Sequence, residues 1–350
     1  MTDDRIRVVL ATPLAPELRS IVTDVDPRVD FLVDDELLPP QRFPGDHTGD
    51  PAYRRTEEQE RRFFELLAQG DILYGIPDVD AGMLARAVRE NPRLQWVQTM
   101  AAGGGSTVKD ADLTADELDR VVFTTSAGVH GPTLTEFAVF GLLAGAKDLP
   151  RLRAQQRRHE WTDRWAMRQL HEMTVLVIGL GGIGADTARV LAAFGTTVIG
   201  VRRHPAPVEH VDRVYGIDEL PHALSRADGI VITLPGTVET EGLYDAAMIA
   251  ATKPGAIVVN VGRGTVIDET ALLEGLDSGR IGYAALDVTA VEPLPADSPL
   301  WDRDDVLISP HTAALSSLED QRIAELFADN LRRHLDGRPL RNVVDTRHFY

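Results

Sequence analysis

The stretch Thr174–Gly184 constrains the fold of this chain more than any other, because it joins a strand pattern to a glycine-rich turn. Its apolar residues Val175–Ile178 run directly into the pattern Gly-x-Gly-x-x-Gly, and a helix-like segment follows from Ile183 to Phe194. An uninterrupted apolar run is typical of a buried parallel strand. The glycines let the backbone approach a pyrophosphate closely, and the helix N-terminus offers N–H groups to its phosphates. The order of strand, turn and helix therefore predicts a dinucleotide-binding site. Its expected residues are Gly179, Gly181, Gly182, Ile183 and Gly184.

Length and composition narrow the class of protein. At 350 residues the chain exceeds the usual size of one domain, so we expect two. The net charge of −18 argues against nucleic acid as a partner, because a polyanion is repelled by such a surface, but it leaves a small anionic ligand open. The absence of cysteine excludes disulfides, thiolate nucleophiles and cysteine-rich metal sites, and we expect no bound metal. Residues Met1–Arg5 lead into only a short apolar stretch, and no run reaches membrane-spanning length. We therefore expect no signal peptide, no membrane segment and a cytoplasmic location.

Apolar runs alternate with amphipathic stretches through most of the chain. In the first third, strands are expected at Arg7–Leu10, Val29–Leu32, Ile72–Tyr74, Leu94–Gln98 and Val121–Phe123, with helices at Glu57–Gln69 and Asp80–Arg89. From Met173 onward, six strands are expected at Val175–Ile178, Thr197–Val201, Ile230–Leu234, Ile257–Asn260, Tyr283–Leu286 and Val306–Ile308. Strands that alternate with helices predict an α/β protein with doubly wound parallel sheets. We expect a flavodoxin-like domain and a Rossmann domain, with a cleft between them.

The connections predict where each domain begins and ends. A helical pattern after Pro132 carries the chain from the first domain into the second. The amphipathic stretch Ser316–Leu335 is expected to fold back on the first domain, because the second sheet is already complete. These crossings predict a substrate domain at residues 1–127 and 316–350 and a dinucleotide-binding domain at residues 128–315. The polar, proline-rich segment Asp34–Arg55 is read as a long loop.

A basic run from Arg151 to Arg158 lies beside Trp161 and Trp165. On an acidic chain, a solvated or inter-subunit arm is favoured over a patch that binds polyanions.

The residues after the second Rossmann strand indicate which dinucleotide is bound. A site for NAD(H) normally carries an acidic residue there, which grips the ribose hydroxyls. In this chain Thr197–Val201 is followed by Arg202 and Arg203, and guanidinium groups form strong paired hydrogen bonds with a phosphate. The pattern favours NADP(H), with NAD(H) possible. The alternative is that both arginines are surface residues beside a tolerant NAD(H) site.

Two turns of the first domain follow predicted strands and could contact a ligand. The turn Thr99–Ser106 contains small residues whose N–H groups can converge on a carboxylate. The other turn, Tyr74–Pro77, gives no preference between a ligand contact and a connector. For Thr99–Ser106 we favour anion binding over a flexible connector.

An arginine, a glutamate and a histidine follow three successive strands of the second domain. Arg263 comes after Ile257–Asn260, Glu292 after the next strand and His311 after the last one. Histidine can donate a proton near neutral pH, and a glutamate on its far ring nitrogen favours the protonated ring. Arginine stays charged, so it can bind a carboxylate and polarise the adjacent carbonyl. Each residue alone is most often structural, but the three together beside a nucleotide fold indicate hydride-transfer chemistry.

These motifs resemble the D-isomer-specific 2-hydroxyacid dehydrogenase family. The matching segments are Val177–Gly184, Asn260–Gly264, Asp287 with Glu292-Pro293, and Pro310–Ala313. The resemblance implies that Arg263 binds substrate, that His311 is the acid/base and that Glu292 is its partner. It implies further cofactor contacts from Thr233, Leu234, Pro235, Val261, Gly262, Asp287, His311, Ala313 and Ala314. It also implies that Ala101, Ala102, Gly103 and Gly104 bind the substrate carboxylate, although Gly104-Gly105 departs from the commoner Val-Asp of the family. Members are typically homodimers through the cofactor domain.

The resemblance predicts an oxidoreductase that reduces a small anionic 2-keto acid, such as glyoxylate or hydroxypyruvate, to the D-2-hydroxy acid with NAD(P)H. Two alternatives stay open. One is a dehydrogenase of another small anion, such as phosphite or formate. The other is a corepressor-like binding protein that senses the cofactor, although such a protein does not need the proton donor.

Overall fold

The computed structural model describes residues 5–349 and divides the chain into two compact units. Unit 1 is formed by the described residues up to His130 together with those from Leu315 onward, and unit 2 by Gly131–Ala314. The expectation that no signal peptide is present concerns Met1–Arg5, and Met1–Asp4 lie outside the described residues. Within residues 5–349, no helix combines the length and the apolar character needed to cross a membrane.

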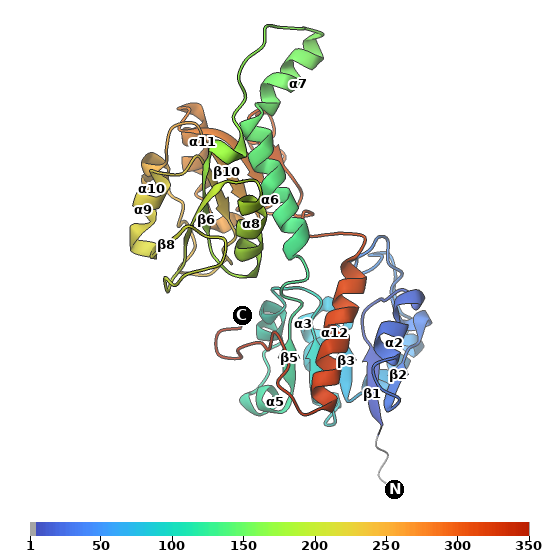
Figure 1. The fold of residues 1–350 in the computed structure, drawn as a ribbon. Coiled ribbons are helices and arrows are strands. Elements are labelled where there is room, and N and C mark those ends of the chain that lie inside the picture. The colour runs from blue at the N-terminus through green and yellow to red at the C-terminus, as the bar shows by residue number, and fades with distance from the viewer. Residues whose placement is uncertain (1–4, 350) are drawn as a thin grey trace. The chain divides into compact units, whose positions relative to one another are not determined.

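Unit 1 is built on a five-stranded parallel sheet with the order β2-β1-β3-β4-β5 (Figure 1). Its strands are β1 (Ile6–Leu10), β2 (Val29–Leu32), β3 (Ile72–Tyr74), β4 (Trp96–Gln98) and β5 (Val122–Thr124). Its α-helices are α1 (Ser20–Thr23), α2 (Glu57–Leu67), α3 (Ala81–Glu90), α4 (Gly105–Asp110), α5 (Ala115–Arg120) and α12 (Glu319–Leu335), and its 3₁₀ helices are η1 (Pro16–Leu18), η2 (Asp35–Leu37) and η3 (Pro77–Val79). This strand order is that of the flavodoxin-like sheets, as predicted.

Local sequence explains where the helices of unit 1 begin. Thr56 starts α2 with a capping box, in which its hydroxyl accepts from the Gln59 N–H at 3.2 Å and the Gln59 side chain accepts from the Thr56 N–H at 2.9 Å. The Asp80 carboxylate caps α3 in the same position. Apart from η2, the segment Asp34–Arg55 has no helix or strand, as its lack of periodicity predicts.

The last helix, α12, packs against unit 1 and contributes to its core. The Phe327 ring stacks on Trp96 of β4 with a centroid distance of 4.8 Å and meets the Tyr74 ring of β3 edge-on at 5.0 Å. All three side chains are fully buried. Burial of such large rings supplies a strong apolar driving force, which accounts for the return of the chain to this unit. The sequence predicted a start at Ser316, but the helix begins at Glu319.

Unit 2 is built on a seven-stranded parallel sheet with the order β12-β11-β10-β9-β6-β7-β8. Its strands are β6 (Thr174–Ile178), β7 (Thr197–Val201), β8 (Arg213–Tyr215), β9 (Gly229–Ile232), β10 (Ala256–Asn260), β11 (Ile281–Leu286) and β12 (Val306–Ile308). Its α-helices are α6 (Gly131–Ala146), α7 (Leu149–Arg158), α8 (Gly182–Ala193), α9 (Leu220–Leu224), α10 (Ala246–Ala251) and α11 (Glu269–Asp277), and its 3₁₀ helices are η4 (Leu170–Glu172), η5 (Ile217–Glu219) and η6 (Gly264–Val266).

The strands β8-β7-β6-β9-β10-β11 of unit 2 have the Rossmann order, and β12 is an additional strand beside β11. The prediction of six strands was wrong by one, because it omitted β8. That strand has only three residues, lies at an edge and buries only Tyr215, so its sequence carries no clear alternation. The predicted α/β class with two parallel sheets is confirmed. Since all strands of unit 2 run parallel, the turns that follow β6, β9, β10, β11 and β12 lie along one edge of the sheet, namely the edge formed by the carboxyl ends of the strands.

Candidate active site

The glycine-rich turn after β6 has the geometry of a nucleotide-binding turn. Gly179 has a φ of +98°, which favours glycine. A Cβ at Gly184 would lie 1.9 Å from the Gly179 carbonyl oxygen, so α8 can pack this closely on the turn only with glycine there. In contrast, a Cβ at Gly181 or Gly182 would meet nothing within 4 Å. The open side of the turn therefore leaves room for a ligand at the start of α8, which has no side-chain cap.

The turn after β9 lies against this glycine-rich turn. The Thr233 hydroxyl donates to the Gly179 carbonyl at 2.7 Å, and the Gly179 backbone lies close to the Leu234 side chain. The next turn along the edge is equally near, because a Cβ at Gly262 would lie 2.5 Å from the Leu234 carbonyl oxygen. The candidate cofactor residues from these turns thus form a continuous surface along the sheet edge.

Arg202 and Arg203 directly follow β7, where a Rossmann site meets the adenosine ribose. Arg202 is half-buried and Arg203 is exposed. Within the described residues, neither guanidinium forms an ion pair or a hydrogen bond. Both charges are therefore available to an anion.

His311 and Glu292 form a direct pair. The His311 Nδ1 atom lies 2.7 Å from Glu292 Oε2, and the other Glu292 oxygen accepts from the Thr289 N–H at 3.2 Å. Their side chains are 45% and 38% exposed, so solvent or substrate can reach them. The contact at Nδ1 directs Nε2 away from the carboxylate and leaves that atom as the position for a proton donor.

Asp287 holds the backbone on either side of His311. Its buried carboxylate accepts from the Ser309 hydroxyl at 2.8 Å and from the N–H groups of Thr312 and Ala313 at 3.0 and 2.9 Å. The His311 N–H donates to the Asp287 carbonyl at 2.9 Å, and His311 adopts a φ of +53°. A non-glycine residue in this region indicates that the surrounding contacts dictate its conformation.

Arg263 is exposed and follows β10. Asn260 shapes this turn, because its buried side chain accepts from the Gly262 N–H and donates to the Arg263 carbonyl, both at 3.0 Å. The Arg263 guanidinium donates to the Gly262 carbonyl at 2.8 Å, and its Cγ lies 3.2 Å from the Cβ position of Gly236. The guanidinium of Arg263 thus lies beside the turns assigned to the cofactor.

The candidate carboxylate-binding turn lies in unit 1, after β4. Ala101, Ala102 and Gly103 are exposed, and Gly104 is buried. Within the described residues, the N–H groups of Ala101, Ala102 and Gly103 donate to no protein acceptor. The Ala101 carbonyl instead holds the turn, because it accepts from the Gly104 and Ser126 N–H groups at 3.2 and 3.3 Å. Free N–H groups on a folded turn provide an anion-binding surface.

Sequence reasoning missed Asn260 and Ser309 as supports of the site. Both occur inside the quoted motifs, at the end of β10 and just after β12, and this position was the available signal. In the part of the chain that the structure describes, no group of three or more His, Asp or Glu side chains is arranged to hold a metal ion.

Comparison with known proteins assigns the family. The family model "D-isomer specific 2-hydroxyacid dehydrogenase, NAD binding domain" matches residues 139–313. The chain belongs to the D-isomer specific 2-hydroxyacid dehydrogenase family. This finding confirms the resemblance seen in the sequence motifs.

Relatives within this 2-hydroxyacid dehydrogenase family differ in their named substrates. D-3-phosphoglycerate dehydrogenase of Mycobacterium tuberculosis is 34% identical over 297 residues, which cover 83% of this chain and 55% of that protein. The chain therefore spans only about half the length of that relative. Glyoxylate/hydroxypyruvate reductase B of Pectobacterium atrosepticum is 32% identical over 308 residues, which cover 80% of this chain and 94% of that protein.

A solved structure of the family matches almost the whole chain. It is a D-isomer specific 2-hydroxyacid dehydrogenase from Xanthobacter autotrophicus Py2 in complex with NADPH and MES. The sequence identity is 31% and the TM-score 0.76, and the match covers 99% of this chain and 100% of that chain.

Proposed function

We propose that this protein is an NADPH-dependent reductase that converts a small 2-keto acid to the D-2-hydroxy acid. The observation that carries the proposal is the His311–Glu292 pair, with Nδ1 and Oε2 2.7 Å apart, on the same sheet edge as Arg263 and the nucleotide-binding turn. A protein that only senses a cofactor has no use for such a proton donor. The names of the relatives, among them a glyoxylate/hydroxypyruvate reductase, support a 2-keto acid as the substrate class.

Unit 2 provides groups that fit a dinucleotide with a 2′-phosphate. The open face at Gly181 and Gly182 accommodates a pyrophosphate at the start of α8, and Arg202 and Arg203 offer two positive charges after β7. The NADPH complex of the relative from Xanthobacter autotrophicus supports the same cofactor here. We assign the remaining contacts along the edge to Thr233, Leu234, Pro235, Val261, Gly262, Asp287, Ala313 and Ala314.

Each residue of the candidate site has its own role in the proposed reaction. When bound, the reduced cofactor supplies a hydride to the carbonyl carbon of the keto acid. His311 gives its Nε2 proton to the carbonyl oxygen, and Glu292 compensates the charge of the protonated ring. Arg263 binds the substrate carboxylate and polarises the carbonyl, and the free N–H groups of Ala101, Ala102 and Gly103 bind the carboxylate as well, while Gly104 closes the turn through the hydrogen bond from its N–H to the Ala101 carbonyl. Hydride and proton together convert the carbonyl group to the alcohol.

A substrate panel tests this function. Purified protein is assayed with glyoxylate, hydroxypyruvate, pyruvate and 3-phosphohydroxypyruvate, each with NADPH and with NADH, by the change in nicotinamide absorbance. We expect turnover of at least one unphosphorylated 2-keto acid with NADPH, and a D-configured product from hydroxypyruvate or pyruvate on chiral chromatography, because the glycolate formed from glyoxylate has no stereocentre. If only 3-phosphohydroxypyruvate were turned over, the substrate would instead belong to the class used by phosphoglycerate dehydrogenases. Oxidation of phosphite or formate without reduction of any keto acid would contradict the proposal.

Substituting the two arginines after β7 should reduce the preference for NADPH. We expect Arg202→Ala and Arg203→Ala each to raise the Kd for NADPH by about 10–100-fold, the range expected for the loss of a charge-assisted hydrogen bond. The Kd for NADH should stay near the wild-type value, because NADH has no 2′-phosphate. Titration of the nicotinamide fluorescence measures both constants.

Arg226→Ala provides the control for these variants, because it removes an exposed arginine from the same unit. If both Arg202→Ala and Arg203→Ala bind NADPH as tightly as Arg226→Ala does, the two arginines do not read the 2′-phosphate.

We also propose that the chain forms a homodimer through residues 149–169. Helix α7 has no fully buried side chain and projects from the rest of unit 2 (Figure 1). Beyond it Trp161 is fully exposed, while Trp165 lies under the Arg151 guanidinium at 3.9 Å. A monomer gains nothing from exposing a tryptophan on a projecting arm, whereas tryptophan is enriched at protein interfaces.

Light scattering should give twice the monomer mass for the wild type and a lower mass for Trp161→Ser at the same concentration. Trp301→Ser is the matched control, because Trp301 is also exposed in unit 2 but lies outside the arm. A wild-type monomer, or an equal loss of mass in both variants, would contradict the proposal.

A further inference from the structure

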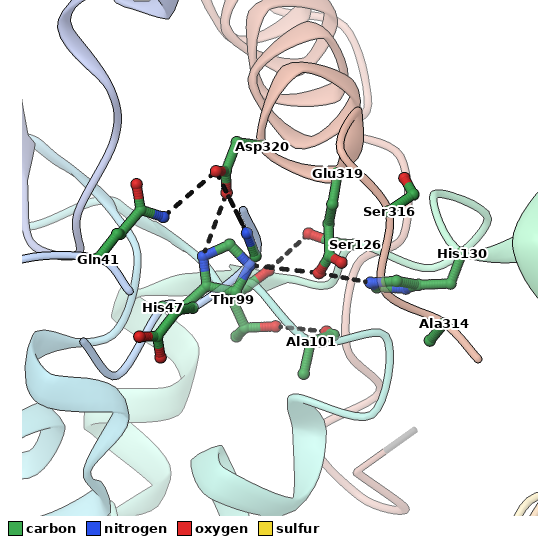
Figure 2. A network of polar contacts seen from close by, with 12 residues as sticks. Gln41, His47, Thr99, Ala101, Ser126, His130, Ala314, Ser316, Glu319 and Asp320 are labelled. Carbon is green, nitrogen blue, oxygen red and sulfur yellow. Dashed lines mark hydrogen bonds and ion pairs between the residues drawn. The ribbon is translucent and has the colours of Figure 1, made fainter. Parts of the chain in front are cut away.

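A second polar cluster lies in unit 1, apart from the residues assigned to catalysis. Figure 2 shows His47 and His130 converging on the carboxylate of Glu319. The same Glu319 oxygen, Oε1, lies 3.1 Å from His130 Nε2 and 3.4 Å from His47 Nε2. The neighbouring Asp320 lies 3.8 Å from the other ring nitrogen of His47 and accepts from Gln41 Nε2 at 3.3 Å and the Gly45 N–H at 3.2 Å. One carboxylate thus joins two histidines that are far apart in the sequence.

The cluster is buried, and the charge of the Glu319 carboxylate is paired with the two histidines. The Glu319 and Asp320 side chains are only 4% and 8% exposed, and both histidines are 12% exposed. Burial alone raises the pKa of the Glu319 carboxyl, but hydrogen bonds from His130 and His47, together with their charge, outweigh it and lower this pKa to about 2. A buried carboxylate is costly unless it is paired in this way. The two histidines thus favour the charged form of Glu319, and their contacts with its carboxylate join the segments that carry the three residues.

The joined segments are those through which the chain leaves and re-enters unit 1. His130 is the last residue of unit 1 before the chain passes into unit 2, and Leu315 is the first residue after the return. Glu319 follows shortly after this return, as the first residue of α12. The third partner is loop 41–49, whose Gly45 backbone lies directly on the carboxylate, since a Cβ there would be 2.7 Å from Glu319 Oε2.

A short chain of contacts leads from this cluster to the candidate carboxylate-binding turn. One residue before His130, the Val129 N–H donates to the Ser126 carbonyl at 3.1 Å. Ser126 is buried, and its own N–H donates to the Ala101 carbonyl at 3.3 Å while its hydroxyl donates to the Thr99 carbonyl at 2.9 Å. The Ala101 carbonyl is the group that holds turn 101–104 in shape. The position of His130 is therefore linked through two backbone hydrogen bonds to that of the turn.

We propose that Glu319 is a positioning residue for the substrate-binding turn of unit 1. It fastens His130, loop 41–49 and the start of α12 to one another, and through Ser126 it holds Ala101–Gly104 in the conformation that binds the substrate carboxylate. This inference depends on the proposed function in one respect, namely the role of that turn. A helix cap alone would affect only α12, whereas the contacts described here predict that three separate segments loosen together.

Hydrogen exchange followed by mass spectrometry tests directly whether Glu319 holds the three segments together. Glu319→Gln keeps the size of the side chain and removes the charge that pairs with both histidines. We expect amide exchange in residues 42–49 and 126–131 to accelerate together by about tenfold, in line with the loss of a hydrogen bond to a charged group. Exchange in the strands of unit 2 should not change. Faster exchange confined to the first turn of α12 would reduce Glu319 to a helix cap and overturn the proposal.

Steady-state kinetics tests the link to the turn. With the keto acid that the wild type turns over best, Glu319→Gln should raise KM by about tenfold and leave kcat and the Kd for NADPH nearly unchanged. His130→Asn should produce the same change in KM, and the double variant should not exceed either single one, because both substitutions break the same link. If Glu319→Gln yields little folded protein, the same kinetics can be measured on His130→Asn instead.

Asp329→Asn is the matched control, since it also converts an acid to an amide on α12 but affects only the partly exposed ion pairs with Arg333 and Arg341, away from the Glu319 cluster. It should behave as the wild type in both measurements. An unchanged KM in Glu319→Gln and His130→Asn would overturn the proposed positioning. A wild type that reduces no keto acid would instead reject the proposed function, and the exchange experiment would still decide whether Glu319 fastens the three segments.

Discussion

The variant His311→Asn is expected to lose about 10²–10⁴-fold in kcat, the usual contribution of a general acid or base. Asparagine can still accept or donate a hydrogen bond near Glu292, but it cannot deliver a proton to the carbonyl oxygen. The Kd for NADPH should stay close to the wild-type value, because the glycine-rich turn and the two arginines are untouched. Stopped-flow measurement of nicotinamide oxidation with the preferred keto acid gives the rate of the chemical step, and fluorescence titration gives the Kd.

The chain offers a close control for this substitution in His348. Its Nδ1 atom lies 2.9 Å from Asp345 Oδ2, so it is also a surface histidine paired with a carboxylate. His348→Asn should leave kcat unchanged. If His311→Asn turned over at a rate similar to that of His348→Asn, the proton would have to come from another group, and the assignment of His311 would be wrong.

For Arg263→Ala we expect a decrease in kcat/KM of about 10²–10³-fold, the cost of losing a donor that stabilises developing charge. The guanidinium acts on both the carboxylate and the carbonyl of the substrate, so KM should rise and kcat should fall together. Arg263→Lys keeps the positive charge but loses the planar fork, and it should recover only part of the activity. Steady-state kinetics over a range of keto-acid concentrations separates the two parameters.

Arg226→Lys and Arg226→Ala are the corresponding controls, because they change an exposed arginine of the same unit outside the candidate site. Full activity in Arg263→Lys would show that charge alone suffices and that no two-point contact is made. Full activity in Arg263→Ala would exclude Arg263 from substrate binding altogether.

The Rossmann unit was the part of the fold most accessible from sequence. Its central strands are apolar along their whole length, as in Val175–Ile178, because both faces of the sheet are covered, and such runs are easy to recognise. The edge strand Arg213–Tyr215 was missed, because one buried residue in three gives no periodic signal. The short helices α4, α5 and α7 were also absent from the prediction, since their few turns carry too little apolar patterning.

Sequence order also indicated which residues share an edge, because parallel strands bring their carboxyl ends together. It could not indicate which side chains touch. The contact of His311 with Glu292 depends on a histidine in the left-handed region, and the buried carboxylate of Asp287 holds the turn that imposes this conformation. Likewise, the conformation of Arg263 depends on the Asn260 side chain, which donates to the Arg263 carbonyl and accepts from the Gly262 N–H.

The sequence alone thus determined the family, the class of both sheets and the residue types available for hydride-transfer chemistry. These properties follow from local patterns: apolar runs, glycines at fixed spacing and charged residues just after strands. The tertiary structure alone decided how distant segments meet, as where His47, His130 and Glu319 come together although His130 and Glu319 are 189 positions apart in the chain. No local pattern encodes such a contact, because the stabilisation that a buried carboxylate gains from its partners exists only when the fold has brought them within hydrogen-bonding distance.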